Sequence, residues 1–200
     1  MPKGIQKSRK IIVIGSSAGG PRVLKWIFTG LPALNASVIV VQHMPKFIND
    51  SLRDSLSSVT AMRVTIARDG DLLENGRVYI APSEVHLSVV DNRIVRLSPG
   101  EKVNYVCPSV DVTMKSLTWD LGVFFAGVVV TGMGKDGAEG MKHIKKLGGT
   151  TIAQDEKTSS IFGMPKEAIQ TGSVDFVLAP DAIREKLIEL AGSEGLRPSA

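Results

Sequence analysis

The feature that most constrains the fold is an apolar run that leads directly into a turn of small residues and then into a proline. The four consecutive β-branched residues at 11–14 predict a buried strand. Pro21 and the apolar spacing over 23–28 predict the first turn and the apolar face of a helix. The turn between them carries Ser16 and Ser17, and its helix-end N–H groups can hold a phosphate or the oxyanion of an acyl-transfer intermediate. This turn is therefore compatible with two different chemistries.

Length and composition set the class of protein. The 200 residues, 43% of them hydrophobic, suffice for one domain, which we expect over 10–191 between a tail or linker remnant at 1–9 and a flexible tail at 192–200. No apolar run approaches the roughly 20 residues of a membrane span, and the first ten residues lack the apolar stretch of a signal peptide. We therefore expect a cytoplasmic protein with no membrane insertion.

Cysteine content and charge limit the kinds of cofactor and partner that we expect. The single cysteine excludes an internal disulfide and a cysteine-based metal cluster, and no ligand cluster has the spacing of a metal site. We expect neither a metal nor an organic cofactor. The net charge of +4 invites a nucleic-acid function, but the basic residues are scattered apart from groups at 3–10 and 142–146. A solvated helix face explains the second group equally well, so we expect no nucleic-acid partner.

Strand-like and helix-like runs alternate along the chain, which is typical of a parallel sheet flanked by helices. The predicted strands are 10–14, 38–41, 63–66, 124–130, 151–154 and 175–178. The predicted helices are 21–29, 47–57, 109–121, 137–147, 165–171 and 181–190. The segment 76–97 interrupts this order, because short strands at 78–80, 85–90 and 93–97 predict an antiparallel insertion. The fold class is α/β: a doubly wound, mostly parallel, Rossmann-like sheet with helices on both faces and a small antiparallel hairpin insertion.

Three loops that follow predicted strands contribute Ser17, His43 and Asp136. In the common doubly wound order these strands are neighbours, and the carboxyl ends of parallel strands meet at one edge of the sheet. A hydroxyl, an imidazole that takes its proton and a carboxylate that orients the imidazole are the parts of a serine hydrolase. The serine strand lies between the other two, so His43 must lean across it to reach Asp136.

Each of these residues also has a structural interpretation. Ser17 could be a helix N-cap, His43 a packed histidine with one backbone partner, and Asp136 a cap of the next helix. Asp155 also follows a strand and is the strongest rival of Asp136, and Asp111 lies near a helix end. The residues interpreted as structural or solvated are His86, His143 and Cys107.

A resemblance favours the hydrolase. Six short motifs cover nearly the whole chain in family order: IGSSAGG at 14–20, QHMP at 42–45, YIAP at 79–82, PSVDV at 108–112, TGMGKDG at 131–137 and FGMP at 162–165. On these motifs the chain resembles the catalytic domain of the chemotaxis protein-glutamate methylesterase family, CheB. The resemblance implies a hydrolase that removes methyl groups from glutamate methyl esters on chemoreceptor helices and, in many members, also deamidates particular receptor glutamines. It implies Ser17 as the nucleophile that forms an acyl-enzyme, His43 as its base and Asp136 as the orienting carboxylate.

The resemblance also implies the oxyanion donors and the partners. The expected donors are the backbone N–H of Met133 and, as a second possibility, those of Ala18 and Gly19. The expected partners are chemoreceptor helices and, in full-length relatives, an N-terminal receiver domain phosphorylated by a histidine kinase. The residues before Lys10 are too few to form a receiver. Cys107 departs from the family pattern, because many relatives have a basic residue there.

Two other functions stay open at this point. A nucleotide-binding module would use the turn at 15–20 to hold phosphate, although that turn lacks the G-x-G-x-x-G spacing. The second glycine-rich loop is not a P-loop, because Lys135 is followed by Asp136 rather than by Ser or Thr. A non-catalytic scaffold would bind receptor segments without turnover, and the intact serine, histidine and aspartate argue against it.

Overall fold

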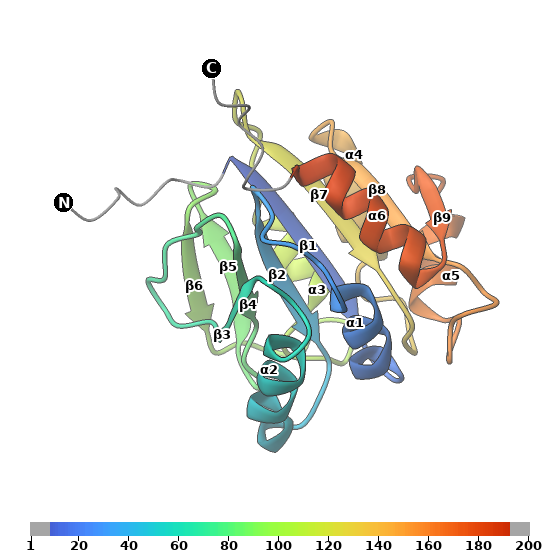
Figure 1. Cartoon of the computed structure of the whole chain (residues 1–200), viewed down its shortest axis with the longest axis horizontal. Helices are drawn as coiled ribbons and strands as arrows, with labels where there is room; N and C mark the ends of the chain where they lie inside the picture. Colours follow the sequence, from blue (N-terminus) through green and yellow to red (C-terminus); the bar gives the residue numbers. More distant parts are fainter. Residues whose placement is uncertain (1–8, 193–200) are drawn as a thin grey trace.

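The apolar run that opens the chain forms strand β1 (Lys10–Ser16) at the centre of a seven-stranded sheet (Figure 1). The structure, a computed structural model, describes residues 9–192, so the tails expected at 1–9 and 192–200 lie almost wholly outside the described residues. The other strands of this sheet are β2 (Ser37–Gln42), β3 (Arg63–Ile66), β4 (Arg77–Ile80), β7 (Phe124–Val129), β8 (Thr150–Gln154) and β9 (Phe176–Leu178). Every pair is parallel, in the order β3-β4-β2-β1-β7-β8-β9.

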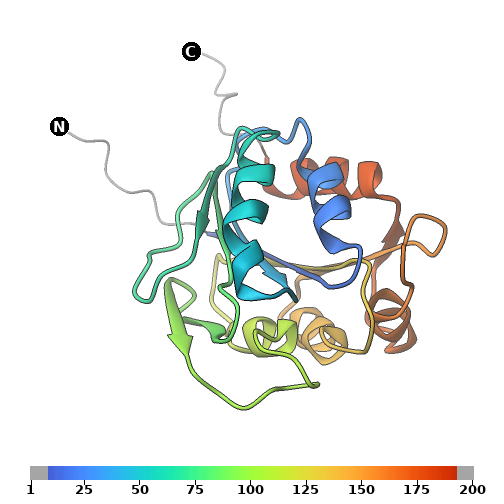
Figure 2. The same cartoon turned by 90° about the horizontal axis from the view of Figure 1, so that it is seen from below.

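Helices cover both faces of the sheet, because successive side chains of β1 point to opposite sides. The helices are α1 (Gly20–Phe28), α2 (Asn49–Ser57), α3 (Val110–Lys115), α4 (Ala138–Lys146), α5 (Met164–Gln170) and α6 (Pro180–Ala191), with a 3₁₀ turn η1 (Lys46–Ile48) before α2. Ile12 and Ile14 pack with α1, α2 and α6, whereas Ile11 and Val13 pack with α3, α4 and α5. Figure 2 shows the sheet between these two helical layers. The predicted doubly wound α/β fold is confirmed.

The antiparallel insertion is smaller than predicted. Strands β5 (His86–Val90) and β6 (Ile94–Ser98) form a separate two-stranded antiparallel hairpin, as expected. The assignment of 78–80 to this insertion was wrong, since β4 lies inside the main sheet between β3 and β2. Val78 and Ile80 pack into one core and Tyr79 into the other, so this strand is buried on both faces like other interior parallel strands.

Helix α3 is also shorter than the helix predicted over 109–121. Ser109 caps its first turn, and the chain leaves the helix after Lys115 because side chains outside the helix bind the backbone beyond it. Asn92 donates to the carbonyl of Thr118 at 2.7 Å and accepts from the Thr118 N–H at 3.0 Å. These bonds replace the intrahelical bonds that would have continued α3.

The order of the central strands positions the three reactive loops. Strand β1 pairs with β2 on one side and with β7 on the other, in register along each strand. Because all three strands are parallel, the loops after them leave from the same edge of the sheet. Among the helices at 9–192, none combines the length and the apolar character that crossing a membrane requires.

Candidate active site

The turn after β1 is held by backbone bonds that leave the side chain of Ser17 partly exposed. The Ser17 N–H donates to the carbonyl of Thr131 at 3.0 Å, and the Ser17 carbonyl accepts from the N–H of Gly20 at 2.8 Å. The N-cap of α1 is Gly19, with a φ of 80° and no side-chain cap. The interpretation of Ser17 as an N-cap is therefore wrong, and its hydroxyl is free of a structural role in the helix.

Gln42 joins the serine turn to the histidine turn. Its side-chain NH₂ donates to the carbonyls of Ser17 at 2.9 Å and His43 at 2.7 Å, and its Oε1 accepts from the Ser16 hydroxyl at 2.7 Å. The His43 N–H donates to the Ser16 carbonyl at 3.0 Å. Gln42 is buried, so these bonds fix the two turns relative to one another in a place that water does not reach.

His43 does lean across β1 to reach Asp136. The distance from His43 Nε2 to Asp136 Oδ2 is 2.9 Å, although the two residues are 93 positions apart in sequence. An ionised carboxylate accepts, so Nε2 carries the proton and Nδ1 presents a lone pair. That Nδ1 is buried and has no hydrogen-bond partner among the described residues. The geometry therefore leaves one buried, unpaired proton acceptor at the edge of the sheet where Ser17 lies.

The carboxylate of Asp136 is surrounded by donors. Besides His43, it accepts from the Ser109 hydroxyl at 2.7 Å, the Val110 N–H at 2.7 Å, the Asp111 N–H at 3.1 Å and the Asn104 side chain at 3.2 Å. Burial by itself would raise the pKa of Asp136, but the bonds from His43, Ser109 and the helix N–H groups outweigh it and lower the pKa. The group is therefore a stable anion. It does not cap α4, whose N-cap is Gly137 without a side-chain bond.

Asp111, the second buried carboxylate, has a different role. Its Oδ1 accepts from the N–H groups of Gly137 at 3.0 Å and Gly140 at 2.7 Å, which lie at the start of α4. Burial raises its pKa, and the nearby charge of Asp136 adds to this rise against the bonds from the glycines and Asn104. Asp111 thus holds α4 in place beside the candidate site and has no hydrogen bond to His43.

The remaining candidates lie in structural positions. Asp155, the rival of Asp136, accepts from the N–H of Thr158 at 2.9 Å within its own turn. His86 bonds the Glu101 carbonyl at 2.9 Å, and His143 bonds the Leu117 carbonyl at 2.7 Å. Burial raises the pKa of the Cys107 thiol, which makes it a poor nucleophile. Within 9–192, no group of three His, Cys, Asp or Glu side chains could hold a metal ion.

The expected oxyanion donors have free N–H groups. No hydrogen bond joins the N–H of Met133, Ala18 or Gly19 to another described residue. The loop that carries Met133 lies against the serine turn because residue 132 is a glycine: a Cβ there would lie 2.7 Å from the Cβ of Ser17. Sequence reasoning missed Ser109 and Asn104 as donors to the carboxylate. The Pro-Ser-Val-Asp motif that contains Ser109 is the signal that could have found that residue.

Comparisons with known proteins identify the relatives of this chain. A family model described as CheB methylesterase matches residues 12–187. Two similar relatives, from Pyrococcus horikoshii and Thermotoga maritima, are named protein-glutamate methylesterase/protein-glutamine glutaminase. They are 41% and 43% identical over 92% of this chain, which spans 54% of each relative. The chain thus spans about half the length of the curated relatives it matches.

A solved structure shows the same fold. The crystal structure of the Thermotoga maritima CheB methylesterase catalytic domain matches with a TM-score of 0.85 and 42% sequence identity. The match covers 91% of this chain and 98% of that one. The chain belongs to the CheB methylesterase family.

Proposed function

We propose that this protein is a serine hydrolase that converts glutamate methyl esters, and specific glutamines, of chemoreceptor helices into glutamates in the cytoplasm. The observation that carries the proposal is the pair of His43 nitrogens. Nε2 bonds to the carboxylate of Asp136, whose pKa is lowered, and Nδ1 is buried with a lone pair that accepts no hydrogen bond from a described residue. An imidazole that a carboxylate orients and whose other nitrogen is free can act as a base, and we assign to it the hydroxyl of Ser17, whose turn Gln42 joins to that of His43. The names of the relatives supply the reaction and the substrate side chain.

The reaction proceeds by acyl transfer. Ser17 Oγ attacks the ester carbonyl while its proton moves to His43 Nδ1, and the resulting imidazolium is stabilised by Asp136. The oxyanion accepts from the free N–H of Met133 and from those after Ser17. The carbonyl then re-forms, the C–O bond to the methoxy group breaks, and His43 gives its proton to that leaving group as methanol. Water repeats the sequence on the acyl-enzyme and releases the glutamate; with glutamine the leaving group is ammonia.

Exposed apolar side chains around the site support a protein substrate. Phe47 is 82% exposed and follows His43 by four residues, in η1. Tyr105 is 92% exposed and adjoins Asn104, which donates to Asp136, while Met133 is 75% exposed in the loop against Ser17. The segments that carry the candidate catalytic residues and their partners therefore also carry large exposed apolar side chains, which are typical of a surface that another protein covers. We assign this surface to the receptor helix, and to a receiver domain phosphorylated by a histidine kinase in full-length relatives.

The test is the release of methanol from methyl-esterified chemoreceptor, with release of ammonia from unmodified receptor followed in parallel. We expect Ser17→Ala to fold normally and to lose more than about 10³-fold in turnover of both substrates, since the hydroxyl forms the acyl-enzyme. Ser16→Ala is the matched control and keeps turnover within about tenfold, because Ser16 binds Gln42 and not substrate. Turnover that survives Ser17→Ala would refute the assignment. Receptor binding without turnover by the unaltered protein would support the scaffold function instead.

A further inference from the structure

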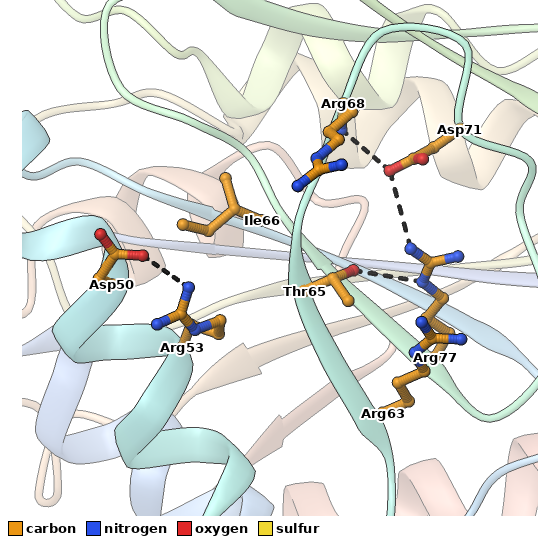
Figure 3. Close-up of a pocket in the computed structure, with 8 residues that line it drawn as sticks. All are labelled: Asp50, Arg53, Arg63, Thr65, Ile66, Arg68, Asp71 and Arg77. Carbon is orange, nitrogen blue, oxygen red and sulfur yellow. Dashed lines mark hydrogen bonds and ion pairs between the residues drawn. The ribbon is translucent and has the colours of Figure 1, made fainter.

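A hollow of about 480 Å³ lies at the open edge of the sheet, and none of the candidate catalytic residues lines it. Its walls come from α2, from the edge strand β3, from β4 and from the loop between these two strands. Figure 3 shows the four arginines that line it together with two aspartates: Arg53, Arg63, Arg68 and Arg77, with Asp50 and Asp71. A pocket of this size matches a small-molecule site, and its arginines select for an anion.

Two of the arginines are neighbours across the strand pair. Arg63 and Arg77 are register partners in β3 and β4, so their side chains leave the sheet on the same face. That face is opposite to α2, because the next pair, Val64 and Val78, packs into the core that contains α2. The hollow, which residues of α2 also line, therefore extends around the edge strand β3. Like charges directly opposite one another destabilise a sheet unless a counter-charge lies between them. An anion bound here would remove this repulsion.

Arg77 is held rigidly with its terminal donors unused. Its Nε donates to the Thr65 hydroxyl at 3.2 Å, and its guanidinium lies 4.7 Å from the centre of the Tyr79 ring. Asp71 and Glu74 lie at 3.9 and 3.7 Å from Nη2 and Nη1, which is beyond hydrogen-bond distance. Neither terminal nitrogen hydrogen-bonds to another described residue, although only 15% of the Arg77 side chain is exposed to solvent.

The wall behind Arg77 is fixed as well. The Tyr79 hydroxyl donates to the Leu72 carbonyl and accepts from the Glu74 N–H at 3.0 Å. Burial raises the pKa of Tyr79 to about 12, so this hydroxyl stays protonated and keeps both bonds. The pocket is therefore preorganised, which reduces the ordering that a ligand would have to impose.

Two of the four guanidiniums form no ion pair with a described residue. Arg53 bonds to Asp50 at 2.6 Å and to Asp54 at 2.9 Å. Arg77 has Asp71 and Glu74 nearby, and Asp71 also accepts from the Arg68 N–H at 2.9 Å. The side chains of Arg63 and Arg68 have no ion pair with any residue in 9–192. Arg63 and Arg68 line the hollow together with Arg77 and its free terminal donors, and guanidinium N–H groups match the oxygens of a phosphate monoester, whose charge is about −1.5 to −2 at pH 7.

We propose that this pocket binds the phosphate group of a small molecule, at a site separate from the hydrolase centre. Arg63 and Arg77 hold the phosphate oxygens from one face of β3, and Arg68 approaches from the following loop. Arginine on an edge strand also hinders unwanted strand pairing, and that role requires neither the rigid Arg77 nor a pocket. The two explanations differ in whether phosphate binds.

The experiment is a calorimetric titration of the whole protein with inorganic phosphate at low salt, with glycerol phosphate and succinate as parallel arms. We expect one phosphate per chain, and affinity lowered about tenfold or more by Arg63→Gln and by Arg77→Gln. Arg63 is exposed, so its variant tests the site even if Arg77→Gln fails to fold. Arg93→Gln is the matched control, because Arg93 is exposed in the β5–β6 turn and its side chain has no bond to a described residue. Ser17→Ala should bind phosphate as the unaltered protein does.

The arms separate the possible outcomes. Glycerol phosphate that binds at least as tightly as inorganic phosphate, with the same losses in the arginine variants, supports a phosphate monoester as the ligand. Tighter inorganic phosphate would point to the free ion and overturn the small-molecule assignment. Succinate that binds as well as phosphate would overturn the phosphate assignment, and affinities equal in Arg63→Gln, Arg77→Gln and Arg93→Gln, or no binding at all, would overturn the site. None of these outcomes depends on whether the protein hydrolyses esters.

Discussion

The carboxylates of Asp136 and Asp111 are exchanged between two helices: each accepts hydrogen bonds from the N-terminus of the helix that begins beside the other. Asp136, just before α4, accepts from the first N–H groups of α3, and Asp111, in the first turn of α3, accepts from the first N–H groups of α4. Helix N-termini favour negative charge, so each carboxylate is stabilised by the other's helix. The exchange locks α3 to α4 and sets the carboxylate that His43 binds.

Replacing Asp136 by asparagine should impair both turnover and stability. All of its partners are donors, so an amide NH₂ in either orientation faces at least two N–H or O–H groups. We expect Asp136→Asn to lower kcat by about 10³- to 10⁴-fold, since the amide cannot stabilise the imidazolium. We also expect about 2 kcal/mol less stability in urea denaturation. Ser109→Ala removes one donor and leaves the others, so a loss as large as that of Asp136→Asn would contradict this account.

Asp111 should make stability depend on pH in a predictable direction. Its pKa is raised above the ordinary 3.8 in the folded protein, so the folded state holds this proton more tightly than the unfolded state does. Its contribution to stability is therefore present below 3.8 and is lost as the pH rises from there through the raised pKa. The variant Asp111→Asn has no titratable carboxyl at this position. The difference in unfolding free energy, unaltered protein minus variant, should fall over that interval and then stay constant, as measured by urea denaturation from about pH 3 to pH 7.

The pH interval separates Asp111 from Asp136. The pKa of Asp136 is lowered, so its own contribution changes below the ordinary value and not above it. A difference curve that rises with pH above 3.8 would show that burial does not dominate the pKa of Asp111.

Apolar runs made the central strands of the fold predictable, but they did not predict which strand pairs with which. β1, β2 and β7 are buried on both faces and stand out in the sequence as apolar stretches, so their order and the meeting of their loops followed from the doubly wound pattern. β4 was misplaced because its apolar run is short and stands beside a true hairpin. Local sequence does not say whether such a run pairs with its neighbour or with a strand 40 residues away.

The candidate site likewise has residues that the sequence predicted and contacts that it did not. Ser17, His43 and Asp136 stood out because each follows a strand and carries reactive chemistry. The bond from His43 to Asp136 and the donors from Ser109 and Asn104 are tertiary contacts, and no spacing in the sequence specifies them. The catalytic roles of these residues stay predictions until the variants are measured.

Gln42→Glu should loosen both turns of the site. The change keeps the shape of the side chain but replaces the NH₂ group that donates to Ser17 and His43 with an acceptor. Two buried carbonyls would then face a carboxylate, which should lower stability by about 3 kcal/mol and reduce turnover. The same change at the exposed Gln170 is the control for added charge. Equal stability of the two variants in urea denaturation would show that Gln42 does not hold the turns.

The exposed apolar residues around the site should matter for a protein substrate and not for a small one. We expect Tyr105→Ala and Phe47→Ala to raise KM for methylated receptor by about tenfold, because exposed aromatic side chains contribute much of the binding energy of protein interfaces. Neither side chain hydrogen-bonds to Ser17, His43 or Asp136, so kcat and the hydrolysis of a short peptide ester should change little. Leu121→Ala is the matched control, since Leu121 is 83% exposed just before the amino end of β7, whereas the candidate site follows the carboxyl ends of the strands. If the control raises KM equally, or if both substrates lose activity together, the apolar surface around the site is not where the receptor binds.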